Sequence, residues 1–250
     1  MVTIKTPQQI ELIAEAGKIL TACHRELRNI ICPGVTTLHI DRFADDFIQS
    51  HGARAAQKGY QNYPFATCAS VNDEICHGFP TNKPLRDGDI VTIDMVVDLD
   101  GWMADSAWSY AVGEVSEQAA KLLRVTKECL YIGIEKAVIG NRLGDISHAV
   151  QSHAEAHNFS VVREFTGHGI GRNIHEDPQV LHYGRPNKGT RICEGMVFTI
   201  EPMINVGSYD LTIDFNGWTA RTRDGSLSAQ YEHTIAITKD GPLVLTEQDK

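Results

Sequence analysis

Three features are missing from this 250-residue sequence, and each absence excludes a class of protein. No run of about 18 apolar residues could form a membrane-spanning helix, and the first residues lack the apolar core of a signal peptide. The six cysteines have no CxxC or similar zinc-knuckle spacing, which argues against a thiolate zinc site and a disulfide framework. A formal charge of −9 disfavours nucleic acids and anionic lipid, which need a basic patch. We therefore expect a cytoplasmic protein with reduced thiols that binds neither membranes nor nucleic acids.

The composition is that of a globular protein, with 42% hydrophobic and 22% charged residues, and its first half reads as two helices followed by strands. A capping box of Thr6 and Gln9 starts a helix that apolar spacing carries to about Ile30. A second helical pattern covers 38–48. The β-branched runs on either side of an Asp-Gly turn predict a β-hairpin over 89–112.

The second half repeats this order, with helices predicted over 116–139 and up to about 157, and strands after them. We expect a single catalytic domain over 1–250, built from pseudo-repeat halves of about 1–112 and 113–250. The match is sparse, so chance is the alternative explanation. Three positions of the first half recur 106 residues later: Gly34, Ile40 and His51 match Gly140, Ile146 and His157.

Two aspartates stand in the predicted hairpin. Asp94 lies in the middle of an apolar strand, where an unpaired carboxylate would cost several kcal/mol, and Asp105 follows eleven residues later on the returning strand. Both side chains reach one point if they share a face of the sheet. Paired acids repel, and the relief is either a shared proton or one or two divalent cations.

The second half offers further ligands. Glu201 and Glu232 are embedded in apolar strand-like segments, and His168 lies between glycines that keep the backbone around it tight. Four carboxylates and one imidazole suit Mn, Fe, Co or Zn ions better than a structural zinc site built from thiolates.

In order and context, these five residues resemble the metal ligands of type I methionine aminopeptidases. The resemblance covers nearly the whole chain, and it implies the α+β pita-bread fold, with two pseudo-symmetric halves, a central antiparallel sheet and helices outside. The absence of a zinc-binding extension and of a long insertion is typical of the short bacterial form. Further motifs that carry the resemblance are 70–74, 76–78, 167–171, 175–176, 198–203 and 230–234.

The resemblance implies a metal-dependent aminopeptidase that removes the initiator methionine from nascent proteins when the second residue is small. Two divalent ions would be held by Asp105 and Glu232 as bridges, by Asp94 at one ion, and by His168 with Glu201 at the other. A bridging hydroxide would attack the carbonyl, with Glu201 as the proton shuttle. The implied partners are N-terminal peptides of nascent proteins, with delivery at the ribosome left open.

The resemblance also assigns substrate contacts. His77 would hydrogen-bond the scissile amide nitrogen, and His175 would stabilise the oxyanion. Tyr63, Cys68 and Trp218, which otherwise read as packing residues, would form an apolar methionine pocket. Ile174 stands where many members carry an aromatic residue. Six other histidines lie in helical stretches and are expected to be solvated or capping: His24, His39, His51, His148, His153 and His157.

Two other functions fit part of this pattern. An aminopeptidase that cuts before proline would share the metal ligands, but such relatives usually carry an extra N-terminal domain. A metal-free binding protein on the same fold would have lost the ligands, and all five are present here. Metal content, and turnover of Met-Ala-Ser against a Xaa-Pro peptide, would separate the three readings.

Overall fold

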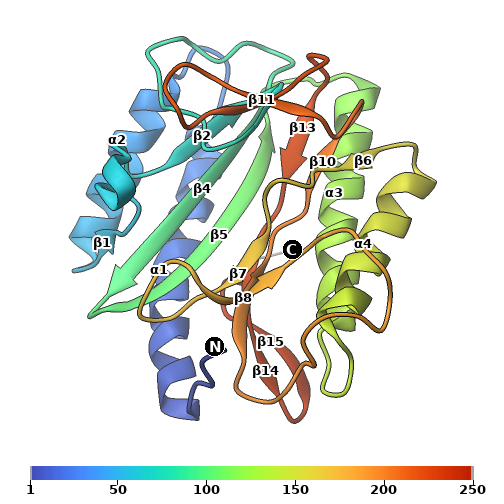
Figure 1. Cartoon of the computed structure of the whole chain (residues 1–250). Helices are drawn as coiled ribbons and strands as arrows, with labels where there is room; N and C mark the ends of the chain where they lie inside the picture. The colour runs from blue at the N-terminus through green and yellow to red at the C-terminus, as the bar shows by residue number, and fades with distance from the viewer. Residues whose placement is uncertain (1, 249–250) are drawn as a thin grey trace.

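The computed structural model describes residues 2–248, which form an α+β structure. Helices α1 and α2 lie on one side and α3 and α4 on the other, with strands between them (Figure 1). The α-helices in this range are α1 (Pro7–Ile30), α2 (Thr37–Ser50), α3 (Glu117–Lys136) and α4 (Leu143–Ala156), and a short 3-10 helix spans Tyr60–Asn62.

Helix α1 begins as its sequence predicts. The Thr6 hydroxyl accepts the Gln9 N–H at 3.3 Å and the Gln9 side chain accepts the Thr6 N–H at 2.9 Å, which satisfies two donors that a helix start leaves unpaired. On the buried face, a Cβ at Gly17 would lie 2.1 Å from the Leu245 carbonyl oxygen. The helix therefore packs against the C-terminal segment so closely that only glycine fits there.

The predicted hairpin is the longest pair of strands, β4 (Ile90–Leu99) and β5 (Trp102–Ala111). Asp100 and Gly101 form its two-residue turn with φ of 52° and 78°, as the favoured hairpin turn requires. The Asp98 carboxylate accepts the Gly101 N–H at 2.7 Å and fixes the turn.

The register of the hairpin decides where its acids point. Asp94 pairs with Ala107 and Asp105 pairs with Val96, so the two aspartates are diagonal neighbours on one face of the sheet. On the other side of β4, Cys68 of β2 (Cys68–Val71) pairs with Asp94. The first half thus presents two carboxylates and a thiol on one face.

Four sheets occur in the described range. Strands β1 and β2 join the hairpin, the largest sheet has the order β15-β14-β9-β7-β8, and the two smaller sheets have the orders β13-β10-β6 and β11-β12-β3. The remaining strand bounds are β1 (Arg54–Ala55), β3 (Glu74–Cys76), β6 (Ser160–Val161), β7 (Gly167–Gly169), β8 (Glu176–Val180), β9 (Val197–Ile200), β10 (Met203–Asn205), β11 (Leu211–Ile213), β12 (Ala220–Thr222), β13 (Ser228–Gln230), β14 (His233–Thr238) and β15 (Gly241–Val244).

The structure confirms the expected helices and the hairpin. One helix ends earlier than expected, and one histidine has a different environment from the expected one. Helix α3 stops at Lys136 and not near Ile139, because Ala137 already has a non-helical backbone. His24 is not solvated but fully buried. Its Nδ1 lies 2.8 Å from the Tyr110 hydroxyl and its Nε2 lies 3.2 Å from the Ser106 carbonyl oxygen, and these two partners are what let a polar ring be buried.

Between residues 2 and 248, none of the helices combines the length and the hydrophobicity needed to cross a membrane. The pseudo-repeat of two halves stays a prediction.

Candidate active site

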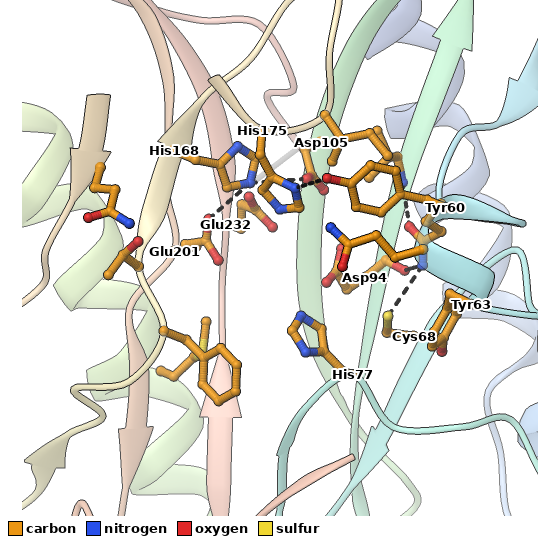
Figure 2. Close-up of a pocket in the computed structure, with 18 of the residues that line it drawn as sticks. Tyr60, Tyr63, Cys68, His77, Asp94, Asp105, His168, His175, Glu201 and Glu232 are labelled. Carbon is orange, nitrogen blue, oxygen red and sulfur yellow. Dashed lines mark hydrogen bonds and ion pairs between the residues drawn. The ribbon is translucent and has the colours of Figure 1, made fainter. Parts of the chain in front are cut away.

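A cavity of about 700 Å³ opens between the hairpin and the strands of the second half. Figure 2 shows acidic and imidazole side chains from both sides turned toward its centre. Every site residue expected from the sequence lines this cavity: Tyr63, Cys68, His77, Asp94, Asp105, His168, His175, Glu201, Trp218 and Glu232.

Four acids reach the cavity floor from different strands. Asp94 and Asp105 come from β4 and β5, Glu201 follows β9, and Glu232 precedes β14. Donor atoms of Asp105, His168 and Glu232 lie within 4.8 Å of one another. All but the half-buried Asp94 are less than 9% exposed, so a group of negative charges is closed off from bulk water.

The environment of Glu201 differs from the sequence expectation of a residue inside a strand. Strand β9 ends one residue before Glu201 and β10 begins two residues after it, since Pro202 has no N–H to continue a ladder. Neighbouring side chains hold Glu201 instead. The Thr199 hydroxyl donates to its Oε1 at 2.6 Å, and its backbone N–H donates to Nε2 of His182 at 3.0 Å.

His168 has a defined tautomer because of its own backbone. Its Nδ1 lies 3.0 Å from the Gly169 carbonyl oxygen, and a carbonyl can only accept, so Nδ1 carries the hydrogen and Nε2 keeps its lone pair. That Nε2 lies 3.6 Å from carboxylate oxygens of both Asp105 and Glu201. The flanking glycines are required here, since a Cβ at Gly167 would lie 2.4 Å from a carbonyl oxygen.

The buried acids cannot all be ionised without a counter-charge. Burial, and then the charge of Asp94, raises the pKa of Asp105 well above its usual value. Burial, and then Asp105, does the same to the pKa of Glu232. For Glu201, burial outweighs the Thr199 hydrogen bond and raises the pKa to about 8. A bound cation would reverse these shifts by favouring the ionised forms.

These donors fit divalent metal ions. Asp105 Oδ1 and Glu232 Oε1 are buried and have no hydrogen-bond partner among residues 2–248, an arrangement that costs stability unless another group satisfies them. Ligand atoms bonded to one ion at about 2.0 to 2.2 Å lie roughly 3 to 4 Å apart, and the two 3.6 Å separations around His168 Nε2 fall in that range. Carboxylate and imidazole donors together are typical of Mn, Fe, Co and Zn sites.

Two further histidines face the cavity without belonging to this acidic cluster. His77 has a left-handed backbone with φ of 55°, a strained conformation of the kind that clusters at functional sites. Burial, and then the neighbouring His175, lowers the pKa of His77 to about 4, so its ring is neutral at pH 7. Nδ1 of His175 lies 2.9 Å from the Tyr60 hydroxyl, which orients the ring (Figure 2).

The cavity wall next to the acids is apolar. The Tyr63 ring packs edge-on against Trp218 with centroids 5.0 Å apart. The Tyr63 hydroxyl donates to backbone carbonyls, which fixes the buried ring in its place in the wall. Cys68 and Ile174 also line the cavity. Because Cys68 is the cross-strand neighbour of Asp94, this wall adjoins the acidic floor directly.

Sequence reasoning gave no role to several residues that support the site. Among them are Tyr60 and Thr199, and Gln57, His182 and Gln230 carry no local signal, since their partners are 19 to 39 residues away in the chain. Gln57, for example, donates to the Asp94 carbonyl oxygen and accepts the Val96 N–H. Only the fold brings these groups to the ligands.

Comparison with known proteins gives a consistent result. The sequence profile of metallopeptidase family M24 matches residues 11–239. A methionine aminopeptidase of Clostridium perfringens is 49% identical over 246 residues, which cover 98% of this chain and 99% of that protein. The crystal structure of the methionine aminopeptidase from Rickettsia prowazekii matches with a TM-score of 0.98 at 46% identity, and covers 99% of this chain and 100% of that chain.

A more distant match concerns the fold alone. The prolidase from Pyrococcus furiosus has a TM-score of 0.81 at 23% identity, with 99% of this chain but only 66% of that chain covered. The expected α+β pita-bread fold is thus confirmed. The chain belongs to metallopeptidase family M24, a family of hydrolases that use divalent metal, and within it to the methionine aminopeptidases.

Proposed function

We propose that this enzyme removes the initiator methionine from nascent proteins whose second residue is small. The observation that carries the proposal is a single cavity whose acidic floor adjoins an apolar wall of Tyr63, Cys68, Ile174 and Trp218. An unbranched thioether suits such a wall. Because the wall lies directly beside the acids, the first peptide bond of a substrate reaches the acidic floor once its first side chain is seated.

Five side chains would hold two divalent ions of Mn, Fe, Co or Zn. These side chains are Asp94, Asp105, His168, Glu201 and Glu232. The buried oxygens of Asp105 and Glu232 that have no hydrogen-bond partner within residues 2–248 support this role, because each would gain a partner. The bound ions would supply a water deprotonated near neutral pH as the nucleophile.

The protein side chains would carry the remaining steps. Glu201, held at Oε1 by Thr199, takes a proton from the attacking water and passes it to the leaving amine. Neutral His77 accepts the scissile amide N–H. Nδ1 of His175 lies 2.9 Å from the Tyr60 hydroxyl; with that hydroxyl as the hydrogen-bond donor, Nε2 of His175 would carry a hydrogen and donate to the developing oxyanion.

The alternatives are less well supported. The chain spans nearly the full length of the methionine aminopeptidases it matches, but about two thirds of the prolidase from Pyrococcus furiosus. A metal-free binding protein would have no need for four acids gathered in one cavity, whose burial raises the pKa of Asp105, Glu201 and Glu232.

The test is kcat/KM over a tetrapeptide panel varied at the first two positions. Met followed by Gly, Ala or Ser should be cleaved well, and norleucine in place of Met should be accepted. Peptides that begin with Leu or Val, peptides with Lys, Glu or Leu at the second position, and Xaa-Pro peptides should have a much lower kcat/KM. A single methylene in an apolar pocket is worth only about 1 to 3 kcal/mol. Equal cleavage of Leu-first or Lys-second peptides would contradict methionine excision and leave a general aminopeptidase.

Metal dependence needs its own control. Chelated enzyme, verified as metal-free, should lose turnover of Met-Ala-Ser and regain it when Co or Mn is added. Full activity of the metal-free protein would rule out the metal-based chemistry.

A further inference from the structure

A second group of metal-binding side chains lies on the helices, outside the cavity. Glu128 of α3 faces His153 and His157 at the end of α4, and one donor atom of each lies within 4.8 Å of the others. None of the three lines the active-site cavity. Helices α3 and α4 lie side by side at one side of the molecule (Figure 1).

A backbone hydrogen bond prepares His157 to bind a cation, and Glu128 orients His153. Nδ1 of His157 lies 2.9 Å from the His153 carbonyl oxygen, and because a carbonyl only accepts, the lone pair of His157 is on Nε2. Nε2 of His153 lies 2.8 Å from Oε2 of Glu128. The two imidazole rings are close, with centroids 4.6 Å apart.

The charged groups around Glu128, His153 and His157 are compatible with one bound cation. His157 caps the C-terminus of α4, where the helix dipole favours a cation. Arg124 binds Oε1 of Glu128 at 2.8 Å and leaves Oε2 for the histidine side, while Lys121 donates to the His157 carbonyl and not to the ring. The side chains of Glu128 and His153 are 37% and 23% exposed, so an ion can enter from solvent.

We propose that Glu128, His153 and His157 form an accessory Zn²⁺ site that joins α3 to the end of α4. Zn²⁺ takes the place of the hydrogen between His153 Nε2 and Glu128 Oε2, with the His153 ring then carrying its hydrogen on Nδ1, binds His157 Nε2 as third ligand, and keeps water in the fourth position. Two imidazoles and one carboxylate select Zn²⁺ and similar transition ions over Mg²⁺ and Ca²⁺. Each helix contributes a ligand, so the ion should stabilise their packing.

The experiment counts all metal bound per chain. Full-length enzyme loaded with Mn²⁺ is dialysed against buffered free Zn²⁺, and manganese plus zinc is measured by mass spectrometry, so that exchange in the cavity does not change the sum. His157→Ala and Glu128→Gln should each bind one equivalent less than wild type. His148→Ala, which removes an exposed histidine of the same helix, should bind as much as wild type.

Turnover of Met-Ala-Ser by the Mn²⁺-loaded variants separates this site from the cavity and confirms that they are folded. Wild-type turnover together with the loss of one equivalent supports the accessory site. Equal metal counts in wild type and both variants would overturn it, and so would a lost equivalent that takes the turnover with it. Because the result is a difference between proteins, it does not depend on how many ions the cavity holds.

Discussion

The four carboxylates of the proposed metal site lie in two kinds of backbone environment. In the first half, Asp94 and Asp105 stand in the middle of two ten-residue strands with an unbroken register. In the second half, Glu201 and Glu232 stand between short strands, β9 and β10 in one case and β13 and β14 in the other. The same cluster is therefore built once by a regular ladder and once by interrupted strands.

This difference shows two ways to position a buried acid. In the hairpin, pleat and register alone put both aspartates on one face. After β9 the backbone ladder stops, and hydrogen bonds from side chains position Glu201 instead. Thr199 and Gln230 donate to the Glu201 carboxylate, and His182 accepts its backbone N–H. We expect hairpin acids to tolerate changes in neighbouring side chains, and Glu201 to depend on them.

The largest effect should come from Glu201 itself. Glu201→Gln alters a proposed metal ligand and the proposed proton shuttle together, and should lower kcat by about 10²- to 10⁴-fold, the usual contribution of general acid-base catalysis. Turnover of Met-Ala-Ser and metal content measure this. The control, Glu155→Gln, makes the same change at an exposed position on α4 and should leave both unchanged. Wild-type turnover of Glu201→Gln with full metal occupancy would remove Glu201 from the mechanism.

The next effect separates catalysis from metal assembly. His77→Ala and His175→Ala should each lower kcat by about 10²-fold, comparable to the loss of one oxyanion donor, with metal content unchanged. Tyr60→Phe removes only the hydroxyl that orients His175, so its effect should be smaller than that of His175→Ala and confined to kcat. Loss of metal from either histidine variant would indicate a structural role.

A smaller effect tests the comparison directly. Thr199→Val removes the hydroxyl that holds Glu201 and keeps the side-chain shape. It should weaken metal affinity or turnover by about tenfold or more, as changes next to metal ligands typically do. Thr92→Val removes a buried hydroxyl of the hairpin that bonds Ser109 and no acid of the cluster, and should leave metal affinity near wild type. Equal losses in both variants would contradict the distinction between the two halves.

The same contrast explains what could be predicted from the sequence. Helix α1 and the β4–β5 hairpin follow from local signals, a capping box and an Asp-Gly turn, which fix structure within a few residues. The shared face of Asp94 and Asp105 then follows from strand geometry. Glu201 and Glu232 are expected as ligands because apolar strand-like segments enclose them, but the breaks beside them leave no regular period that would show which way each side chain points.

Other parts of the site could not be read from the sequence, because they depend on long-range contacts. His182 and Glu201 are 19 residues apart and Tyr60 and His175 are 115 apart. The prediction that His24 is solvated or capping was wrong for the same reason. Helical spacing shows on which face of the helix a residue lies, but not which polar groups it contacts in the folded protein. Its partners, Tyr110 and Ser106, are more than 80 residues away.

The smallest expected effect compares one histidine from a helix of each half. Burial lowers the pKa of His24 in α1 to about 4, whereas His148 in α4 is exposed. The folded state therefore favours the neutral form of His24, and the stability this provides is present above about pH 6.5 and is lost as the pH falls toward 4. In His24→Gln, the free energy of unfolding should fall less steeply as the pH drops from 6.5 to 4. The difference in slope corresponds to the uptake of up to one proton fewer on unfolding.

Urea unfolding at half-unit steps between pH 7 and pH 4 measures this slope, with His148→Gln as the matched variant. The slope of His148→Gln should equal that of wild type, because this variant makes the same substitution at an exposed position of α4. His24→Gln also removes a ring that bonds Tyr110 and Ser106, so its stability should be lower at pH 7. The prediction concerns how the free energy of unfolding changes with pH and not its lower value at pH 7. A wild-type slope in His24→Gln would mean that the ring is protonated in the folded protein or that α1 opens before it titrates.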